Sequence, residues 1–142
     1  MEPITAVRPA IAGMCPYIQV FDMPLSLQFY RDVVGFVVSQ SSGADDDVDW
    51  VLLQLGESWL MLNTIYEKDD RPPKPDPARA AGHEDTAFFF SCRDLDLMYT
   101  YLVSKNVKVT SPFKTGYGFK AINLKDPDGY GLTFHWPLEE GK

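Results

Sequence analysis

The sequence is poor in cysteine, histidine and basic side chains, and these shortages exclude several classes of protein. Its 142 residues include two cysteines, Cys15 and Cys92, which are too few for a disulfide framework and too far apart for a Cys-x-x-Cys site. Thirteen lysines and arginines face 20 aspartates and glutamates, and the net charge of −7 argues against binding to a nucleic acid backbone. We therefore expect a reduced, cytoplasmic protein with no nucleic acid partner.

Long apolar runs are also missing. No stretch approaches the roughly 20 apolar residues that a membrane-spanning helix needs, and residues 1–8 lack the basic and apolar segments of a secretory signal. Hydrophobic residues make up 45% of the chain, which is typical of a globular domain. We expect a chain of this length to bury its own core and to have no membrane partner.

Proline is concentrated in one place. Four of the seven residues from Arg71 to Pro77 are prolines, which predicts an extended, semi-rigid segment. We interpret about 64–86 as a linker, because an unstructured loop of that length is unusual inside a compact domain. The linker separates module one, about 14–63, from module two, about 87–137.

Each module shows the same order of elements. In module one, Asp22 is a good helix N-cap and Gly35 suits the left-handed position that ends a helix. We expect strands over 17–21, 36–40, 50–55 and 59–63, and a solvated acidic loop over 41–47. In module two, Asp94 or Asp96 begins a helix that Asn106 ends. We expect strands over 87–92, 107–110, 119–124 and 132–136, a glycine-containing loop over 114–118 and a tight turn over 126–129.

The spacing of the two modules indicates an internal repeat. Asp22 and Asp94 are separated by 72 positions, as are Leu60 and Leu132. One module alone has too few strands to bury both faces of a sheet. The sequence therefore predicts an α+β fold in which two βαβββ modules form an eight-stranded curved sheet. The helices would cover its outer face and leave a concave cup on the inner face.

Three motifs, in order, resemble the vicinal oxygen chelate superfamily, which includes glyoxalase I, bleomycin-resistance and fosfomycin-resistance proteins and extradiol dioxygenases. Residues 22–36, ending in Phe-Tyr-Arg-Asp-Val-Val-Gly-Phe, resemble its first-helix signature, and Asp126–Tyr130 resembles its final hairpin. Gly116–Phe119 is similar to a loop of the bleomycin-resistance-like members. The resemblance covers about 17–137 and implies one domain over 1–142, paired βαβββ modules and a homodimer.

The same resemblance bears on metal binding. Metal-dependent members of the superfamily hold a divalent ion in the cup with His, Glu or Gln. Alignment places the corresponding positions at Cys15, Met61, Ala87 and Thr133. These side chains are a poor donor set for such an ion, so we expect no metal and no cofactor. A displaced site that uses His135, His83 or Glu84 stays open as the alternative.

Strand alternation predicts which side chains line the cup. The predicted ligand-binding residues are Tyr17, Gln19, Trp59, Met61, Asn63, Phe89, Ser91, Thr133 and His135. Trp50, Tyr117 and Phe119 are expected at its edge. Such an apolar, aromatic cavity with a few polar groups is typical of a small-ligand pocket, although the same side chains could fill the cup as core. His135 is a weak candidate for a general base, because no sequence neighbour would orient it.

Three functions follow from these observations. The first is a protein that binds a small organic ligand without chemistry, and an aromatic, cationic ligand would suit the acidic charge and the aromatic lining. The second is a metal-dependent lyase, isomerase or dioxygenase with a displaced metal site. The third is a non-catalytic dimeric module whose cup is filled by side chains.

Overall fold

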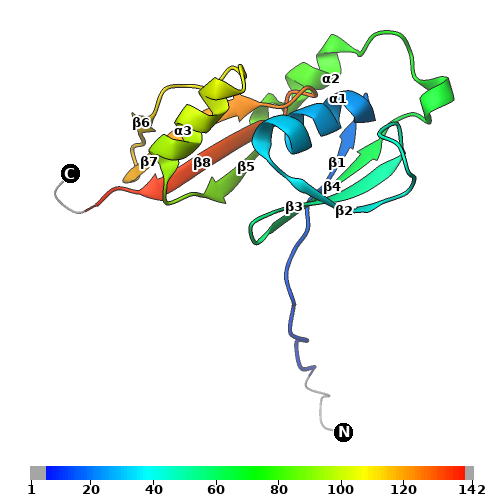
Figure 1. Ribbon diagram of the computed structural model, residues 1–142. Coiled ribbons are helices and arrows are strands. Elements are labelled where there is room, and N and C mark those ends of the chain that lie inside the picture. Colours follow the sequence, from blue (N-terminus) through cyan, green and yellow to red (C-terminus); the bar gives the residue numbers. More distant parts are fainter. Residues whose placement is uncertain (1–5, 140–142) are drawn as a thin grey trace, which may run out of the picture.

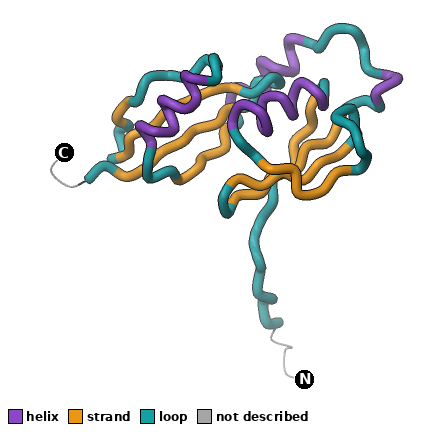
Figure 2. Tube along the Cα trace, viewed as in Figure 1, coloured by secondary structure: helices purple, strands orange, loops and turns teal. Residues whose placement is uncertain are grey.

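The computed structural model describes residues 6–139, in which eight strands form two four-stranded sheets (Figures 1 and 2). Sheet one has the order β1-β4-β3-β2, with β1 at Tyr17–Val20, β2 at Val37–Ser41, β3 at Trp50–Leu55 and β4 at Ser58–Thr64. Sheet two has the order β5-β8-β7-β6, with β5 at Ala87–Ser91, β6 at Phe113–Lys114, β7 at Phe119–Lys125 and β8 at Gly131–Pro137. The predicted α+β fold of two βαβββ modules is confirmed, with four strands in each hydrogen-bonded sheet.

The helix of module one follows its sequence signals. α1, Met23–Leu27, continues into the π-helical η1, Gln28–Val34. The Asp22 carboxylate accepts the Leu25 N–H at 3.2 Å, as an N-cap residue does. At the other end, Gly35 has φ of 105°, and the Tyr30 carbonyl accepts the N–H groups of both Gly35 and Phe36. In module two, α3 spans Leu95–Ser104 and Asn106 takes φ of 60° just beyond it. Both predicted helices are confirmed.

The linker is more structured than the sequence suggested. It contains η2, Lys68–Asp70, the helix α2, Pro77–Gly82, and η3, His83–Asp85. The predicted extended segment, 71–77, contains no helix before Pro77, but the linker beyond it is helical, where the sequence indicated only a loop. Asp76 caps α2 by accepting the Ala78 N–H at 3.0 Å, and Pro77 follows at the first helical position. The alanine-rich sequence after Pro77 then favours helix, which the prolines before it had obscured.

The predicted strand at 107–110 is also wrong. This segment makes a single β-bridge, between Val109 and Leu124, and the edge strand forms later, at β6. At Thr110 the backbone N–H donates to the Asn123 carbonyl, but the Thr110 hydroxyl, rather than a carbonyl, accepts the Asn123 N–H. A side chain thus replaces the backbone acceptor and interrupts the ladder.

The helices lie on one side of the two sheets (Figure 1). The buried apolar residues of both modules belong to one cluster. A chain of edge-on and stacked aromatic rings crosses from one module to the other. Its ring centroids are 5.5 Å apart between Tyr30 and Phe36, 6.0 Å between Phe36 and Phe90, and 5.1 Å between Phe90 and Phe134. These rings join the two modules in one continuous hydrophobic core.

The turn between β7 and β8 is the main polar link between the modules. Its Asp128, which is almost fully buried, accepts the Phe21 N–H at 2.9 Å and forms an ion pair with Arg79 of α2 at 2.6 Å. Arg79 also donates to the carbonyl of Gln19. Gly129 has φ of +89°, and a Cβ there would collide with the carbonyl of Ala80. The turn therefore fixes β1 and α2 at the same time.

Asp126 anchors the same turn to the first helix. One carboxylate oxygen accepts the N–H groups of Asp128 and Tyr130, and the other accepts the Tyr30 hydroxyl at 2.6 Å. Burial raises the pKa of Asp126 to about 6, because these hydrogen bonds only partly offset the loss of water around the charge. Burial and the nearby Asp126 carboxylate raise the pKa of Tyr30. The motif that resembles the family's final hairpin thus has a structural role in this chain.

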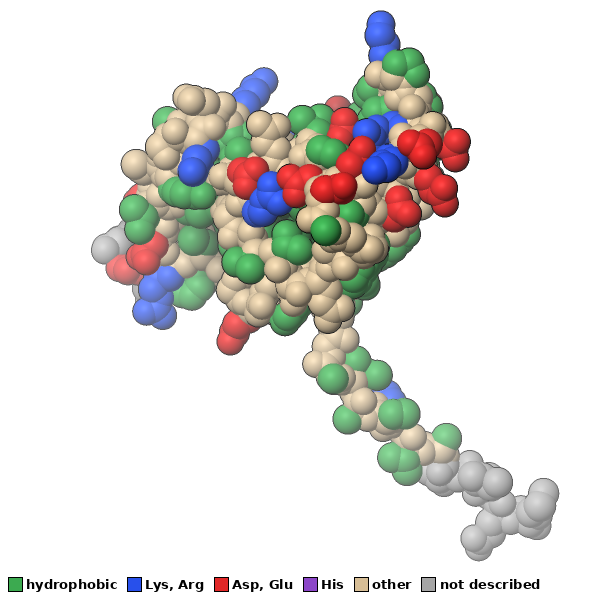
Figure 3. All heavy atoms as spheres, turned by 45° about the vertical axis from the view of Figure 1, so that its right-hand side comes forward, with side chains coloured by type: hydrophobic (Ala, Val, Ile, Leu, Met, Phe, Trp, Pro, Cys, Tyr) green, Lys and Arg blue, Asp and Glu red, His purple; other side chains and the backbone are tan. Residues whose placement is uncertain are grey.

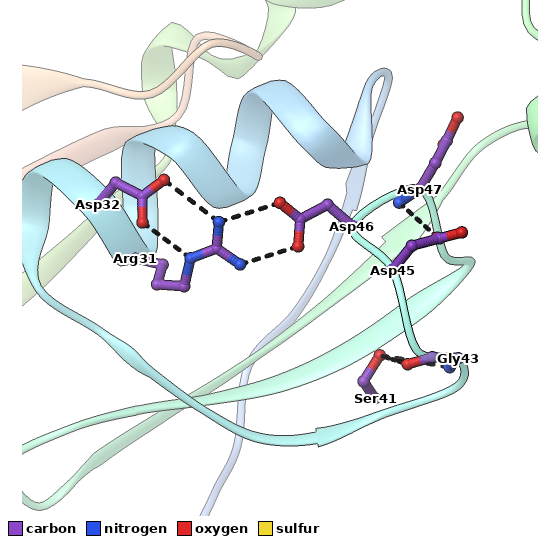
Figure 4. Close-up of polar contacts among 7 residues, drawn as sticks. All are labelled: Arg31, Asp32, Ser41, Gly43, Asp45, Asp46 and Asp47. Carbon is purple, nitrogen blue, oxygen red and sulfur yellow. Dashed lines mark hydrogen bonds and ion pairs between the residues drawn. The ribbon is translucent and has the colours of Figure 1, made fainter.

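The acidic loop of module one is exposed and held by arginines. Arg31 of η1 lies between Asp32 and Asp46, with nitrogen–oxygen distances of 2.8 and 2.9 Å (Figure 4). Arg71 of the linker pairs with Asp47 at 3.0 Å. Hydrogen bonds from Arg31 lower the pKa of both Asp32 and Asp46. Figure 3 shows acidic and basic side chains intermixed on this side of the molecule.

Candidate functional site

The inner face, defined here as the side of each sheet away from the helices, carries the predicted ligand-binding residues of module one. Along β1, Ile18 and Val20 are buried against the helix, whereas Tyr17 is 52% exposed and Gln19 is exposed. Register pairs Tyr17 with Met61 and Gln19 with Asn63, which places their side chains on one face. Trp59 lies two residues before Met61 on β4, so it shares this face, and it is 39% exposed. These five residues form one patch on sheet one.

The inner face of sheet two carries the remaining four. Register pairs Phe89 with Thr133 and Ser91 with His135. Phe89 is 54% exposed, Ser91 is exposed, His135 is half-buried and Thr133 is buried. The nine predicted residues therefore lie in two patches, one on each sheet. In the single chain, several of their aromatic rings face solvent and do not pack as core.

Aromatic rings surround His135. The Phe119 ring stacks on it at a centroid distance of 4.6 Å, and Phe89 meets it edge-on at 5.1 Å. Tyr117 lies 5.4 Å from Phe119 and extends the cluster. The Nδ1 atom of His135 is buried, and no other residue that the structure describes forms a hydrogen bond with it. Sequence reasoning placed Phe119 and Tyr117 only at the edge, and the structure joins both rings to His135 in one aromatic cluster.

A groove of about 620 Å³ opens at the end of sheet two. Thr133 is the one predicted ligand-binding residue among those that line it. Its hydroxyl donates to the Asn123 side-chain carbonyl at 2.7 Å. Lys108 and Lys125 lie at the rim, and Lys125 pairs with Glu84 at 3.4 Å. Sequence reasoning missed Asn123, although its alternation with Ala121 along β7 places it on the inner face.

The residues aligned with the family's metal ligands do not fit a divalent ion. Ala87 has no donor atom, and the Thr133 hydroxyl is already bonded to Asn123. Between residues 6 and 139, no group of three or more His, Cys, Asp or Glu side chains could hold a metal.

The alternative, a displaced metal site, would use His83, Glu84 or His135, and each of these residues contacts different partners. His83 bonds the Asp128 carbonyl through Nδ1 at 2.7 Å and stacks on Tyr130, Glu84 pairs with Lys125, and His135 lies in its aromatic cluster. The metal-free state stays a prediction.

His135 lacks the contacts of an oriented general base. A base in hydrolytic or proton-transfer chemistry is usually held by a hydrogen bond from its second nitrogen to a carboxylate or carbonyl. The buried Nδ1 of His135 makes no such bond within the described part of the chain. What the ring does offer is a polar edge between two aromatic faces, which suits ligand contact better than proton transfer.

Comparison with known proteins gives a consistent result at the level of fold. Residues 10–134 match the family model described as the Glyoxalase/Bleomycin resistance protein/Dioxygenase superfamily. No curated protein matches the sequence. Within 6–139, no helix has both the length and the apolar character needed to cross a membrane.

Solved structures with the same fold have low sequence identity. TnmS3, an antibiotic-binding protein from Streptomyces sp. CB03234, is 19% identical with a TM-score of 0.65, over 92% of this chain and 99% of that one. A glyoxalase/bleomycin resistance protein/dioxygenase from Nocardioides is 18% identical with a TM-score of 0.68, over 98% and 90%. TioX from Micromonospora sp. ML1 is 16% identical with a TM-score of 0.68, over 89% and 99%.

Proposed function

Because the chain belongs to the glyoxalase/bleomycin resistance protein/dioxygenase superfamily, we propose that it binds a small, planar organic ligand on the inner face of its sheets, without a metal and without chemistry. The observation that carries the proposal is the set of aromatic rings left open to solvent there, with Tyr17 and Phe89 more than half exposed. Rings presented in this way stack on flat ligands. TnmS3, which shares the fold, is an antibiotic-binding protein, and this supports a small organic ligand for the present chain.

The proposed assembly is a homodimer. Large aromatic side chains on an open sheet face are unfavourable in water, and a second copy would cover them. The two patches of the inner face lie on separate sheets, so a partner that closes over them would turn each shallow patch into a pocket. The acidic net charge of −7 favours a cationic ligand over an anionic one. A cytoplasmic location remains a prediction.

Ligand titration tests this function directly. The purified protein is titrated with bleomycin and with a neutral anthraquinone while tryptophan fluorescence is followed. We expect saturable quenching by at least one of them, weakened about tenfold by Phe89→Ala because a stacking surface is lost. Leu97→Ala is the matched control, since Leu97 is 68% exposed on α3, away from the inner face. Quenching that never saturates with either compound, or that falls equally in both variants, would contradict the proposal.

One observation favours the metal-dependent lyase, isomerase or dioxygenase as a second candidate. The Nδ1 atom of His135 has no hydrogen-bond partner among residues 6–139, and an unbonded imidazole nitrogen is a potential metal ligand. The untagged protein is incubated with Zn²⁺, Ni²⁺, Mn²⁺ or Fe²⁺, freed of excess ion and assayed for bound metal. Near-stoichiometric metal that is lost in His135→Ala would favour the enzyme over the binding protein.

A further inference from the structure

The groove at the end of sheet two presents hydrogen-bond donors to a ligand. The Thr133 hydroxyl donates to the side-chain carbonyl of Asn123, and this bond leaves the Asn123 amide nitrogen with two N–H groups to donate. Asn123 is exposed, and within residues 6–139 no group accepts a hydrogen bond from that nitrogen. The polar group that a ligand meets at this point of the groove is therefore a donor.

Two lysines add positive charge to the same groove. Val109 bridges Leu124 in antiparallel register, and the next pair in that register is Lys108 with Lys125. Lys125 pairs with Glu84 at 3.4 Å, whereas Lys108 is exposed and has no ion pair with any residue that the structure describes. Like charges that lie opposite each other on neighbouring strands repel, and an anion bound between them would remove this cost.

The charge of the chain is divided unequally between its modules. Module two, 87–137, has six lysines and arginines against four aspartates and glutamates, a net charge of +2. Module one, 14–63, has one against seven, a net charge of −6. Two of the four acidic residues of module two, Asp126 and Asp128, are buried in the turn between β7 and β8. The net charge of −7 acts on a ligand at a distance, but the charged groups that line the groove are two lysines and one glutamate.

The groove lies next to an aromatic ring of the inner face. Phe89 and Ala87 are two residues apart on β5, so their side chains share a face and are separated by roughly 7 Å along the strand. Ala87 pairs in register with Gly131, and both line the groove. These two small residues leave space beside Phe89, because a Cβ on Gly131 would already lie 3.3 Å from the Ala87 Cβ. A flat ring that stacks on Phe89 can therefore extend a substituent into the groove.

We propose that the groove binds a carboxylate group of the ligand through Lys108, Lys125 and the Asn123 amide, while the attached rings stack on Phe89. The inference rests on the proposed function and names one group that its ligand carries. A carboxylate has enough acceptor positions for all three donors, and hydrogen bonds to an ionised group are the strong ones. An ammonium group in the same place would meet two like charges, with Glu84 already paired to Lys125.

Three probes with the same rings and different charges test the proposal. At pH 7, 2-naphthoate is anionic, 2-naphthamide is neutral and 2-(aminomethyl)naphthalene is cationic. Isothermal titration calorimetry of the full chain at low salt measures their dissociation constants. We expect naphthoate to bind about tenfold more tightly than naphthamide, and the cation to bind most weakly. Equal affinities for the acid and the amide, or tighter binding of the cation, would overturn the proposal.

Two substitutions test whether the carboxylate lies in the groove. Asn123→Asp keeps an oxygen that accepts the Thr133 hydroxyl but replaces the amide donor with a negative charge, so the preference should reverse in favour of the cation. Lys108→Gln should weaken naphthoate about fivefold and leave naphthamide unchanged. Lys114→Gln is the matched control, because Lys114 also lies opposite a lysine, Lys120, but on β6 and outside the groove. An equal loss in both lysine variants, or an unchanged preference in Asn123→Asp, would contradict the site.

The same probes separate this inference from the proposed function. If all three bind saturably with one affinity that Phe89→Ala weakens, ring stacking on the inner face is supported and the carboxylate site alone is overturned. If none of them binds saturably, both are contradicted, because the rings themselves are not held.

Discussion

The two modules repeat one order of elements, but their last turns have different roles. In module one, the turn after β3 passes through Gly56 and Glu57, is exposed, and closes a hairpin. In module two, the corresponding turn buries Asp126 and Asp128 and binds the first helix, the first strand and the linker helix. The repeat thus determines where each turn lies in its own module, and the neighbouring module determines what its side chains do.

Removing the buried carboxylate of Asp128 should give the largest difference in stability between changes in the two turns. Asp128→Ala leaves Arg79 without its carboxylate and the Phe21 N–H without its acceptor. We expect the free energy of unfolding to fall by about 4 kcal/mol, as for a broken buried ion pair. Glu57→Ala on the exposed turn should change it by less than about 0.5 kcal/mol. Urea unfolding followed by circular dichroism measures both, and equal losses would remove the distinction between the turns.

The glycines of the two turns sharpen the comparison. Gly56 has φ of +57° with nothing within 4 Å of an added Cβ, so Gly56→Ala should cost about 1 kcal/mol of backbone strain. At Gly129, φ of +89° is combined with a collision against Ala80 of α2. Gly129→Ala should cost about 3 kcal/mol, because α2 must move as well. Thermal unfolding of both variants tests this, and a smaller loss at Gly129 than at Gly56 would show that α2 does not restrict the turn.

The two turns should also differ in how much they contribute to the pH dependence of stability. The folded pKa of Asp126, about 6, is raised above its unfolded value of about 3.9, so the folded state holds the proton more tightly. The resulting stabilisation is fully present below about pH 4 and is lost as the pH rises through about 6. Relative to Asp126→Asn, the parent protein should lose on the order of 2 kcal/mol across this window.

Urea midpoints of the parent protein and of Asp126→Asn at pH 4, 5, 6 and 7 measure this effect. Glu57→Gln on the exposed turn is the matched control and should follow the parent protein at every pH. A difference between parent and Asp126→Asn that stays constant with pH would show that Asp126 titrates normally.

The smallest effect is expected from the acidic loop of module one. Asp46 and Arg31 form a two-bond ion pair, but both side chains are partly exposed. Asp46→Asn should lower stability by about 0.5 kcal/mol, and the loss should shrink in 1 M salt because surface pairs are screened. Melting temperatures at low and high salt measure this. A loss that is independent of salt would indicate that the loop is held by packing instead.

Sequence patterns predicted the regular elements well where the signal was local. The caps at Asp22 and Gly35 and the alternation of β3 and β4 depend on residues next to each other, and these elements form where expected. The two errors had different causes. α2 was hidden by the prolines before it, and the ladder at 107–110 is interrupted by a Thr110 side chain that bonds Asn123.

The candidate site was predictable in its residue types but not in its arrangement. Alternation identified which side chains share a face, because the period of a strand is fixed. It could not show that the nine residues lie on two separate sheets, nor that Phe119 stacks on His135. It also gave no sign that Asp126 and Asp128 bind module one, since contacts between turns and distant elements leave no periodic pattern.

The bond between Asp128 and the Phe21 N–H has a consequence for how the protein is made. The two residues are 107 positions apart, so ribosomal synthesis delivers β1 long before the turn that covers its outer edge. Until then, the backbone at Gln19 and Phe21 is an unpaired strand edge, the kind of surface on which nascent chains associate wrongly. Module one should therefore depend on chaperones or on rapid elongation during this interval, and a chain arrested before the turn should aggregate.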